Sequence, residues 1–532
     1  MKINKFNWLN IYFPVIALTL LSIFLAILKV RSGYSFHGDT ANYYVLLENI
    51  HRGLGPYNQF MATLVDYSYI DKIHSIDLVE FCKKSFDSVT HNADDFDHFR
   101  FHFYPILYPL STLLYLFKAP YVTHFIDIFS FLLFLYIAYY ILIKNHCGPL
   151  LSILIVAVIS FHPAWSWSIQ SAPFPDRLYL PLGLLSIYLI DFKNSTKYGL
   201  LALSICSLIV EKVILYSGIF LIAHTLLFYK KNKDIFTRLA FGVFLILVFE
   251  LLKRYQLTSN PYYESFINLS PGALLNLFKD PFFLNGAISL LLVNLPFLLI
   301  ILVKSPRLFV ITVAMMVPNI IGNIGGAEKT GYFTHYHTLY FPFLVYSFCI
   351  SISEIQQGIL KRKEIFRVFQ YLILLLIFIF LYCVNFSDSQ KLKLGYRNNL
   401  SYLSYFSRIY SDKNNYEFIT QQIDQYIPKM SKVSSVEGGW PYLYQHLNSS
   451  FLPYNINTAD FLIVNYSESE GKYSYGGIMS FGGVEKTKAL TACLNTKIEQ
   501  AKFNVDNPIK LSTSLAILTK DFTQAEGRKS PQ

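Results

Sequence analysis

The sequence predicts an all-α polytopic membrane domain of about eleven transmembrane helices, followed by a small α/β domain outside the membrane. Two observations carry this prediction. Of the 532 residues, 53% are hydrophobic and only 15% are charged, a balance too apolar for a soluble protein of this length. The apolar residues fall into long runs up to residue 386, whereas residues 387 to 532 contain more Asn, Ser, Lys and Asp and only short apolar runs.

Most of the apolar runs are each long enough for one spanning helix. One run, 198 to 229, is too long, and Glu211 and Lys212 lie at its middle. Each charge would cost roughly 3 kcal/mol in hydrocarbon on insertion scales, so we expect two shorter helices that meet at this pair. The other expected spans lie near 11 to 30, 121 to 143, 148 to 165, 178 to 192, 235 to 252, 282 to 303, 307 to 323, 337 to 354 and 368 to 386.

The loop charges fix the expected orientation in the membrane. With the N-terminus inside, every compact basic cluster between the runs falls on the inner side, as the positive-inside rule requires. A single helix over 198 to 229 would move the basic cluster at 230 to 233 to the outer side. The first run has no small-residue cleavage site after it, so we expect a retained helix rather than a signal peptide. The odd number of helices then leaves the C-terminus outside.

We therefore expect two domains. Residues 1 to 386 form a polytopic membrane domain that includes a large outer loop at 31 to 120. Residues 387 to 532 form an extracytoplasmic α/β domain, in which the run 460 to 464 has the pattern of a β-strand. The short apolar stretch 106 to 117 is expected to be an interfacial or re-entrant helix.

The distribution of charge argues against a nucleic-acid partner. The net charge of +11 could indicate a nucleic-acid partner. Because the basic residues lie in short clusters between apolar runs, membrane topology and anionic lipid explain them better, and we expect no nucleic-acid partner.

The six cysteines show no metal-ligand spacing. Cys82 and Cys493 are the two that we place outside, where a disulfide between them is one interpretation and two separate thiols the favoured one.

Several short motifs lie where one class of membrane enzymes carries functional residues. They are Asp39 in the stretch 37 to 39, the proline-led helix that begins at 104 to 107, and the helix pair broken near Lys212. In this layout the sequence resembles the GT-C class of membrane glycosyltransferases over most of the chain. More narrowly, it is similar to a bacterial family of uncharacterised polytopic membrane proteins with a GT-C-like layout, through the motifs 102 to 107, 211 to 212, 335 to 336 and 459 to 464.

The resemblance implies transfer of a sugar from a polyprenyl-phosphate donor to a lipid, glycan or protein acceptor at the outer face of a bacterial inner membrane, with inversion. Asp39 would be the general base that deprotonates the acceptor hydroxyl. Membrane lipid and the polyprenyl-phosphate-linked sugar are the expected partners, and the oligomeric state stays open. Outer-face cations or donors for the donor phosphate are Arg177, Lys212, Lys329, His335 and His337. Candidates for the substrate pocket are His37, His102, Tyr104, Glu211 and Tyr336.

Structural roles compete with these functional ones. Asp39 precedes an expected helix over 41 to 52 and could be its N-cap, and one residue can fill both roles. Arg177 could anchor the outer end of its helix, and Glu211 with Lys212 could be a self-neutralised pair at a helix junction.

An acidic cluster in the outer loop is the candidate for a metal site. Its oxygen-rich side chains could hold Mg²⁺ or Mn²⁺. Without a second element to supply ligands, we favour a solvated acidic loop and assign no cofactor, although a divalent cation stays open. The cluster consists of Asp94, Asp95, Asp97 and His98.

Two other functions are compatible with many membrane spans. The main alternative is a multi-spanning transporter or lipid flippase without glycosyl transfer. Transporters tend to contain inverted repeats with paired broken helices, whereas in this sequence only the run 198 to 229 is broken. The third interpretation is a non-enzymatic surface or assembly protein, for which substitution of Asp39 by Asn would leave function intact.

Overall fold

The computed structural model divides the chain into two compact units, each described here by itself. The bundle unit comprises Met1–Leu28, Phe99–Leu107 and Tyr121–Arg408, and the sheet unit comprises Lys29–His98, Tyr108–Pro120 and Ile409–Gln532. Within them the structure describes residues 9–33, 38–60, 97–162, 172–228, 234–257, 272, 279, 281–321, 335–360, 415–452, 455–467, 472–474, 483–512 and 514–520.

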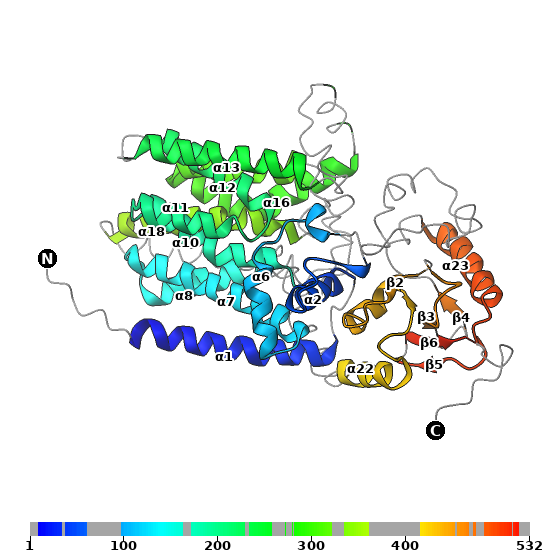
Figure 1. The fold of residues 1–532 in the computed structure, drawn as a ribbon. Coiled ribbons are helices and arrows are strands. Elements are labelled where there is room, and N and C mark those ends of the chain that lie inside the picture. The colour runs from blue at the N-terminus through cyan, green and yellow to red at the C-terminus, as the bar shows by residue number, and fades with distance from the viewer. Residues whose placement is uncertain are drawn as a thin grey trace. The chain divides into compact units, whose positions relative to one another are not determined.

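The bundle unit is built from apolar helices, coloured blue to yellow-green in Figure 1. Every expected span inside the described ranges is a helix, and the span expected at 368 to 386 lies outside them. Prolines stand at the first position of three helices, where the missing N–H costs no hydrogen bond. The helices are α1 (Leu9–Ser32), α7 (Ala119–Lys144), α8 (Pro149–Ser160), α10 (Tyr179–Asp191), α11 (Thr196–Cys206), α12 (Glu211–Leu227), α13 (Ile235–Tyr255), α16 (Pro281–Lys304), α17 (Pro306–Ile321) and α18 (Phe341–Leu360), with the short 3₁₀ helices η6 (Pro175–Leu178) and η9 (His335–Leu339).

The break in the long run 198 to 229 is confirmed. Helix α11 ends at Cys206 and helix α12 begins at Glu211, after an extended Val210. The two charges therefore open a helix instead of lying within one, where hydrocarbon would surround them.

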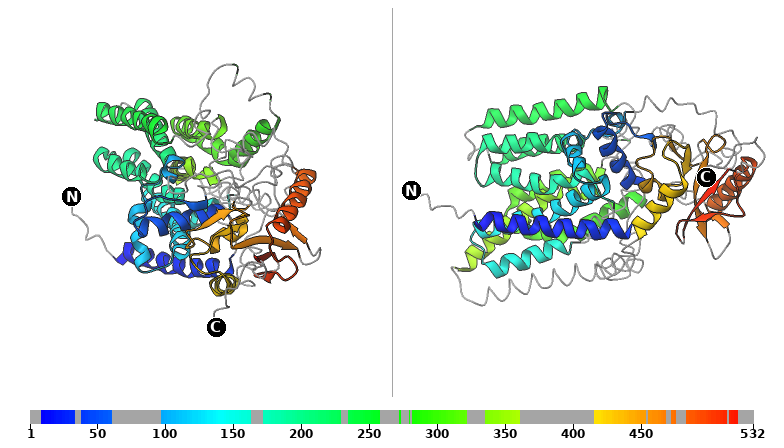
Figure 2. Two further views of the ribbon diagram at one scale, coloured as in Figure 1. Left: turned by 45° about the vertical axis from the view of Figure 1, so that its right-hand side comes forward. Right: turned by 60° about the horizontal axis from the view of Figure 1, so that its bottom comes forward.

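Helices α12 and α13 pack closely along their length, as both views in Figure 2 show. Gly218 and Gly242 face each other at this contact. A Cβ atom at Gly218 would lie 2.8 Å from the carbonyl oxygen of Gly242, so the absence of side chains allows the two backbones to approach.

Three helices in the described part of the chain are long and apolar enough to cross a membrane: Phe13–Ser32, Ala119–Lys144 and Ile235–Tyr255. Several further apolar helices are shorter, among them Pro149–Ser160 and Pro306–Asn319. The chain is thus an integral membrane protein, whereas the count of eleven spans and the sidedness stay predictions.

The sheet unit joins the expected outer loop to the C-terminal region. It contains α2 (Gly38–His51), α22 (Asn415–Tyr426), α23 (Gly483–Gln500) and the 3₁₀ helix η10 (Glu437–Tyr442). The stretch expected to be an interfacial helix forms α6 (Leu107–Ser111) and the 3₁₀ helix η5 (Thr112–Tyr115). Residues 29 to 98 group with residues 409 to 532, an association that the sequence-based division at residue 387 does not anticipate.

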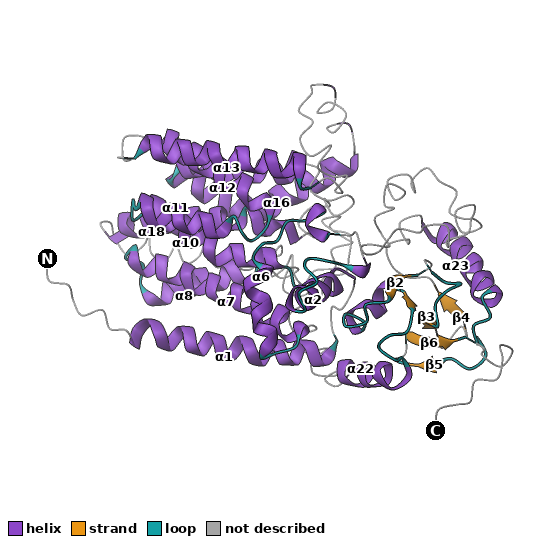
Figure 3. Cartoon of the chain, viewed as in Figure 1, coloured by secondary structure: helices purple, strands orange, loops and turns teal. Residues whose placement is uncertain are grey.

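A small mixed sheet lies in the C-terminal region, where Figure 3 shows all the strands of the described chain. Its order is β2-β1-β3-β6-β5, with β4 also pairing with β3. β1 is parallel to β2 and β3, while β6 is antiparallel to β3 and β5. The β-like run at 460 to 464 is confirmed as part of β3. The strands are β1 (Val433–Ser435), β2 (Ser449–Phe451), β3 (Phe461–Ser467), β4 (Lys472–Ser474), β5 (Ile509–Lys510) and β6 (Leu515–Thr519).

One cysteine is disulfide-bonded where the favoured expectation was a free thiol. Cys493, on α23, is disulfide-bonded, so the interpretation of two separate thiols is wrong for this residue. Cys147, Cys206 and Cys349 are free and buried. Cys82 lies outside the described residues.

Candidate functional site

Glu211 joins two motifs that are more than a hundred residues apart in the sequence. Its Oε1 atom lies 3.0 Å from Nδ1 of His102, and its Oε2 atom accepts a hydrogen bond of 2.9 Å from the backbone N–H of Phe103. The Glu211 side chain has no exposed surface, so both carboxylate oxygens depend on these partners for the solvation that they have lost. The first residue of α12 thus holds the segment of residues 101 to 106, which we call the strap.

Backbone and ring contacts fix the same strap. The N–H of Ile106 donates to the carbonyl oxygen of Leu208, in the connection between α11 and α12, over 2.8 Å. The rings of His102 and Tyr104 lie 5.6 Å apart, and Tyr104 is buried. Three of the five predicted pocket residues, His102, Tyr104 and Glu211, therefore lie together in the bundle unit.

Asp176 and Lys212 add two further buried charges. Asp176 lies in η6, directly before α10, and both side chains are only 2% exposed. Burial raises the pKa of the Asp176 carboxyl, with Lys212 acting in the opposite direction and Glu211 reinforcing the increase. His102 also interacts electrostatically with Asp176 and lowers its pKa. We call Asp176, Glu211, Lys212 and His102 the charged cluster.

The charged cluster contains one unsatisfied acceptor. Among the described residues, no hydrogen-bond donor meets Oδ1 of Asp176. A buried oxygen of this kind costs about 1–3 kcal/mol, which proteins tend to accept where a ligand, ion or proton occupies the position during function. Asp176 was not predicted from the sequence, although its neighbour Arg177 was. The available signal was a charged residue just before the apolar run 178 to 192.

Arg177 is occupied by a different partner. Its Nη1 atom pairs with Asp127 of α7, and its Nη2 atom donates to the carbonyl oxygen of Ala172 over 3.1 Å. The guanidinium also lies 5.8 Å from the centroid of the Phe174 ring. Removing one partner of such a buried pair typically costs about 3–5 kcal/mol, so this contact fixes η6 against α7. Asp127 was not predicted, although a lone acid in the apolar run 121 to 143 was visible.

The predicted histidines of η9 lie at the same end of the bundle unit. η9 contacts η6 and α12, so the backbones of His335 and Tyr336 are close to the charged cluster. The His337 ring is buried, and its Nδ1 atom is 2.7 Å from the hydroxyl of Tyr340, which also accepts a 3.0 Å hydrogen bond from Asn294. Of the other predicted phosphate ligands, Lys329 lies outside the described residues.

Asp39 belongs to the sheet unit. It lies in the first turn of α2, which begins at Gly38, three residues before the helix expected at 41 to 52. The described structure covers its backbone and not its side chain. His37, its predicted neighbour in the pocket, lies outside the described residues.

The described part of the acidic loop shows structural contacts. Asp97 pairs with Tyr57 in an isolated β-bridge, and Nδ1 of the buried His98 lies 3.5 Å from the side-chain nitrogen of Asn58. Among the described residues, no group of three or more His, Cys, Asp or Glu side chains could hold a metal ion. Asp94 and Asp95 lie outside those residues.

Comparison with known proteins gives solved structures with an overall likeness, among them one glycosyltransferase. The crystal structure of ArnT from Cupriavidus metallidurans bound to undecaprenyl phosphate, a GT-C glycosyltransferase, has 11% sequence identity and a TM-score of 0.48. The similarity covers 99% of this chain and 100% of that chain. No family model matches, and no curated protein matches. At this identity and TM-score, the likeness carries no argument about what this chain does.

Proposed function

We propose that this chain is a membrane glycosyltransferase that moves a sugar from a polyprenyl-phosphate donor to a lipid, glycan or protein acceptor at the outer face of a bacterial inner membrane. The observation that supports it best is the charged cluster in the bundle unit. Ionisable side chains buried in a membrane protein are costly, and they mark functional sites by default.

In the proposed reaction, the acceptor hydroxyl oxygen attacks the anomeric carbon of the sugar. The bond from that carbon to the phosphate oxygen breaks, and polyprenyl phosphate leaves with the bonding electrons. A general base takes the hydroxyl proton, and we assign this role to Asp39. Direct displacement of this kind inverts the anomeric configuration, and it leaves the protein to neutralise the charge that gathers on the phosphate.

Lys212 is the residue to which we assign the phosphate. Lys212 is the second residue of α12, and the backbone N–H groups and the helix dipole at this N-terminus also favour an anion. Asp176 interacts electrostatically with Lys212 and is therefore a counter-charge to it. Because burial raises the pKa of Asp176, its protonation when a phosphate binds would keep the number of buried negative charges constant.

The proposal gives the remaining predicted residues supporting roles. His335 and His337 of η9 would supply further hydrogen bonds to the donor, together with Lys329. His37, Tyr104 and Tyr336 would contact the sugar or the first isoprene units. Arg177 would act by holding η6, and therefore Asp176, in place. The proposal includes about eleven spans with the N-terminus inside and the C-terminal domain outside.

Binding of undecaprenyl phosphate to the detergent-purified chain tests the phosphate assignment. We expect Lys212→Ala to weaken binding at least about tenfold, because a charge-assisted hydrogen bond to a buried phosphate is lost. Lys197→Ala is the matched control, since Lys197 is an exposed lysine on α11. Equal affinity of wild-type protein and the Lys212 variant would contradict the assignment.

A further inference from the structure

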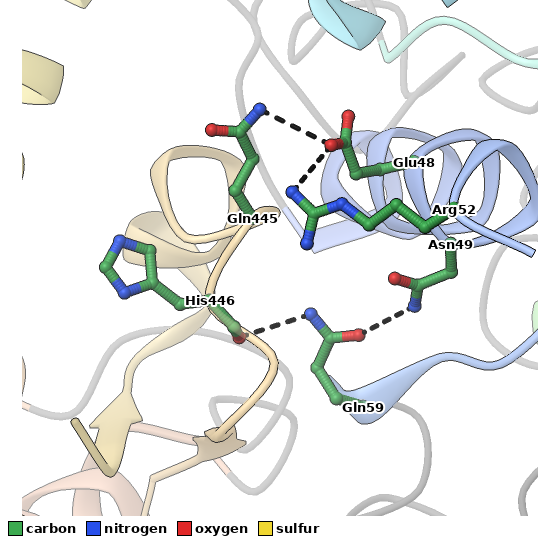
Figure 4. A network of polar contacts seen from close by, with 6 residues as sticks. All are labelled: Glu48, Asn49, Arg52, Gln59, Gln445 and His446. Carbon is green, nitrogen blue, oxygen red and sulfur yellow. Dashed lines mark hydrogen bonds and ion pairs between the residues drawn. The ribbon is translucent and has the colours of Figure 1, made fainter. Parts of the chain in front are cut away.

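The sheet unit places helix α2 inside the C-terminal region, through contacts between residues almost four hundred positions apart. Figure 4 shows these contacts. Asn49 of α2 is fully buried, and its Nδ2 atom donates to the carbonyl oxygen of Tyr57 over 2.8 Å and to Oε1 of Gln59 over 3.1 Å. Nε2 of Gln59 in turn lies 3.4 Å from the carbonyl oxygen of His446, to which it donates. A continuous chain of hydrogen bonds thus runs from α2 to the segment after η10.

A second polar contact lies one residue earlier on α2. Oε1 of Glu48 accepts from Arg52, the residue directly after the helix, over 2.7 Å, and from Nε2 of Gln445 over 3.5 Å. Neighbouring residues on each side, Glu48 with Asn49 and Gln445 with His446, therefore carry the two connections. Two adjacent contacts of this kind limit rotation of α2 about its axis.

Aromatic pairs flank the polar contacts. The rings of Tyr44 and Tyr444 meet edge to face with centroids 5.8 Å apart, and Phe60 stacks on Trp440 at 4.7 Å. Trp440 is itself fixed, because its indole N–H donates to the carbonyl oxygen of Ser435 at the end of β1 over 3.1 Å. Such pairs contribute about 0.5–1.5 kcal/mol each beyond the burial of their area.

The composition of α2 explains why it needs this support. The helix has 14 residues, a length that is marginal for an isolated helix in water. Its buried residues occupy all sides, including Ala41, Tyr44, Val45 and Leu46, which is the pattern of a core helix rather than of a helix in an exposed loop. The position of α2 is therefore set by the unit around it.

From this arrangement we infer that the C-terminal α/β domain is a positioning element for catalysis, and that Asn49, Gln59 and Gln445 are its positioning residues. They hold the helix whose first turn carries Asp39. The inference rests on the proposed function, because it gives Asp39 the role of the base. It adds a task for the C-terminal domain and a specific set of side chains that perform it.

The test uses the full-length protein and the variant Gln59→Leu, which removes both hydrogen bonds of the Gln59 amide at similar volume. The first measurement is hydrogen–deuterium exchange over residues 38 to 51, and the second is kcat and KM with undecaprenyl-phosphate sugars. We expect faster exchange in α2 and a fall in kcat of about tenfold to a hundredfold with KM changed less than about threefold, because a misplaced base slows the chemical step without weakening donor binding. Gln421→Leu on α22 is the matched control, since Gln421 is exposed and outside the hydrogen-bond chain.

A milder variant covers the case in which Gln59→Leu does not fold. Gln445→Ala removes only the contact to Glu48, and we expect a smaller effect in the same direction on both measurements. Unchanged exchange in α2, or faster exchange with normal kcat, overturns the inference while the proposed function stands. Absence of turnover by the wild-type protein overturns both, so the two failures are distinguishable.

Discussion

Nδ1 of His102 lies 3.0 Å from Oε1 of Glu211, and this contact closes the strap of residues 101 to 106 over the start of α12. The same carboxylate receives the Phe103 N–H, so one side chain satisfies two donors from one short segment. Lys212, which we propose to bind the donor phosphate, follows Glu211 directly in the sequence. Movement of the strap would therefore change the surroundings of Lys212.

Substitution of Glu211 tests this relationship. In Glu211→Ala the strap loses both hydrogen bonds, and we expect a loss of roughly 1.5–3 kcal/mol for each hydrogen bond to a charged group. Thermal unfolding of the purified protein in detergent measures it. Glu250→Ala on α13 is the matched control, because the Glu250 side chain is 55% exposed and pairs with Lys253 on the same helix. A Glu211 variant as stable as this control would contradict the structural role of the contact.

Substitution of Asp176 is expected to have opposite effects on stability and on activity. Burial raises the folded pKa of the Asp176 carboxyl above the ordinary value of 3.8, so the unfolded chain releases this proton at a lower pH than the folded chain, and the wild-type protein loses stability as the pH rises from 3.8 through the folded pKa. Asp176→Asn removes this loss, and we expect a higher melting temperature than wild type at about pH 8 and little difference at about pH 4.

The same Asp176→Asn variant should transfer sugar at least about tenfold more slowly if the carboxyl takes part in phosphate binding. Melting curves at the two pH values and initial rates at one pH separate the two effects. A variant that gains stability and keeps full activity would remove Asp176 from the proposed centre.

His446 makes the sheet unit sensitive to acid. Burial lowers the pKa of its imidazole below 6.5, with Asp424 raising it and Lys429 lowering it. The unfolded chain therefore binds a proton at a higher pH than the folded chain, and stability falls as the pH decreases from 6.5 toward the folded pKa. His446→Gln should flatten the melting temperature over this range. His146→Gln, at an exposed histidine of the bundle unit, is the control variant.

Close packing of α12 on α13 predicts a steric effect at Gly218. A new Cβ there would meet the backbone oxygen of Gly242 at 2.8 Å, and a backbone atom cannot move aside as a flexible side chain can. We expect Gly218→Ala to destabilise the protein by about 1–3 kcal/mol, as overpacking typically does. Gly148→Ala is the control, because nothing lies within 4 Å of the Cβ position there. Equal melting temperatures for the two variants would argue against tight packing of these helices.

Local features of the structure were accessible from the sequence, whereas partners distant along the chain were not. The helix break at Glu211 could be predicted because a charged pair in the middle of an apolar run has few other solutions. The pairing of Arg177 with Asp127 could not, because nothing in the spacing of these residues indicates which charges meet. The same holds for Gln59 and His446, whose contact depends on the grouping of the outer loop with the C-terminal region.

Turnover is the most direct measurement of the proposed activity. Purified wild-type protein is incubated with a panel of undecaprenyl-phosphate hexoses and pentoses and a crude lipid and glycan acceptor fraction, and release of undecaprenyl phosphate is followed by mass spectrometry. We expect release from at least one donor by the wild-type protein, at least about a hundredfold slower release by Asp39→Asn, and a similar loss in Lys212→Ala. Release at the wild-type rate by both variants would contradict the assignment of these two residues to the reaction.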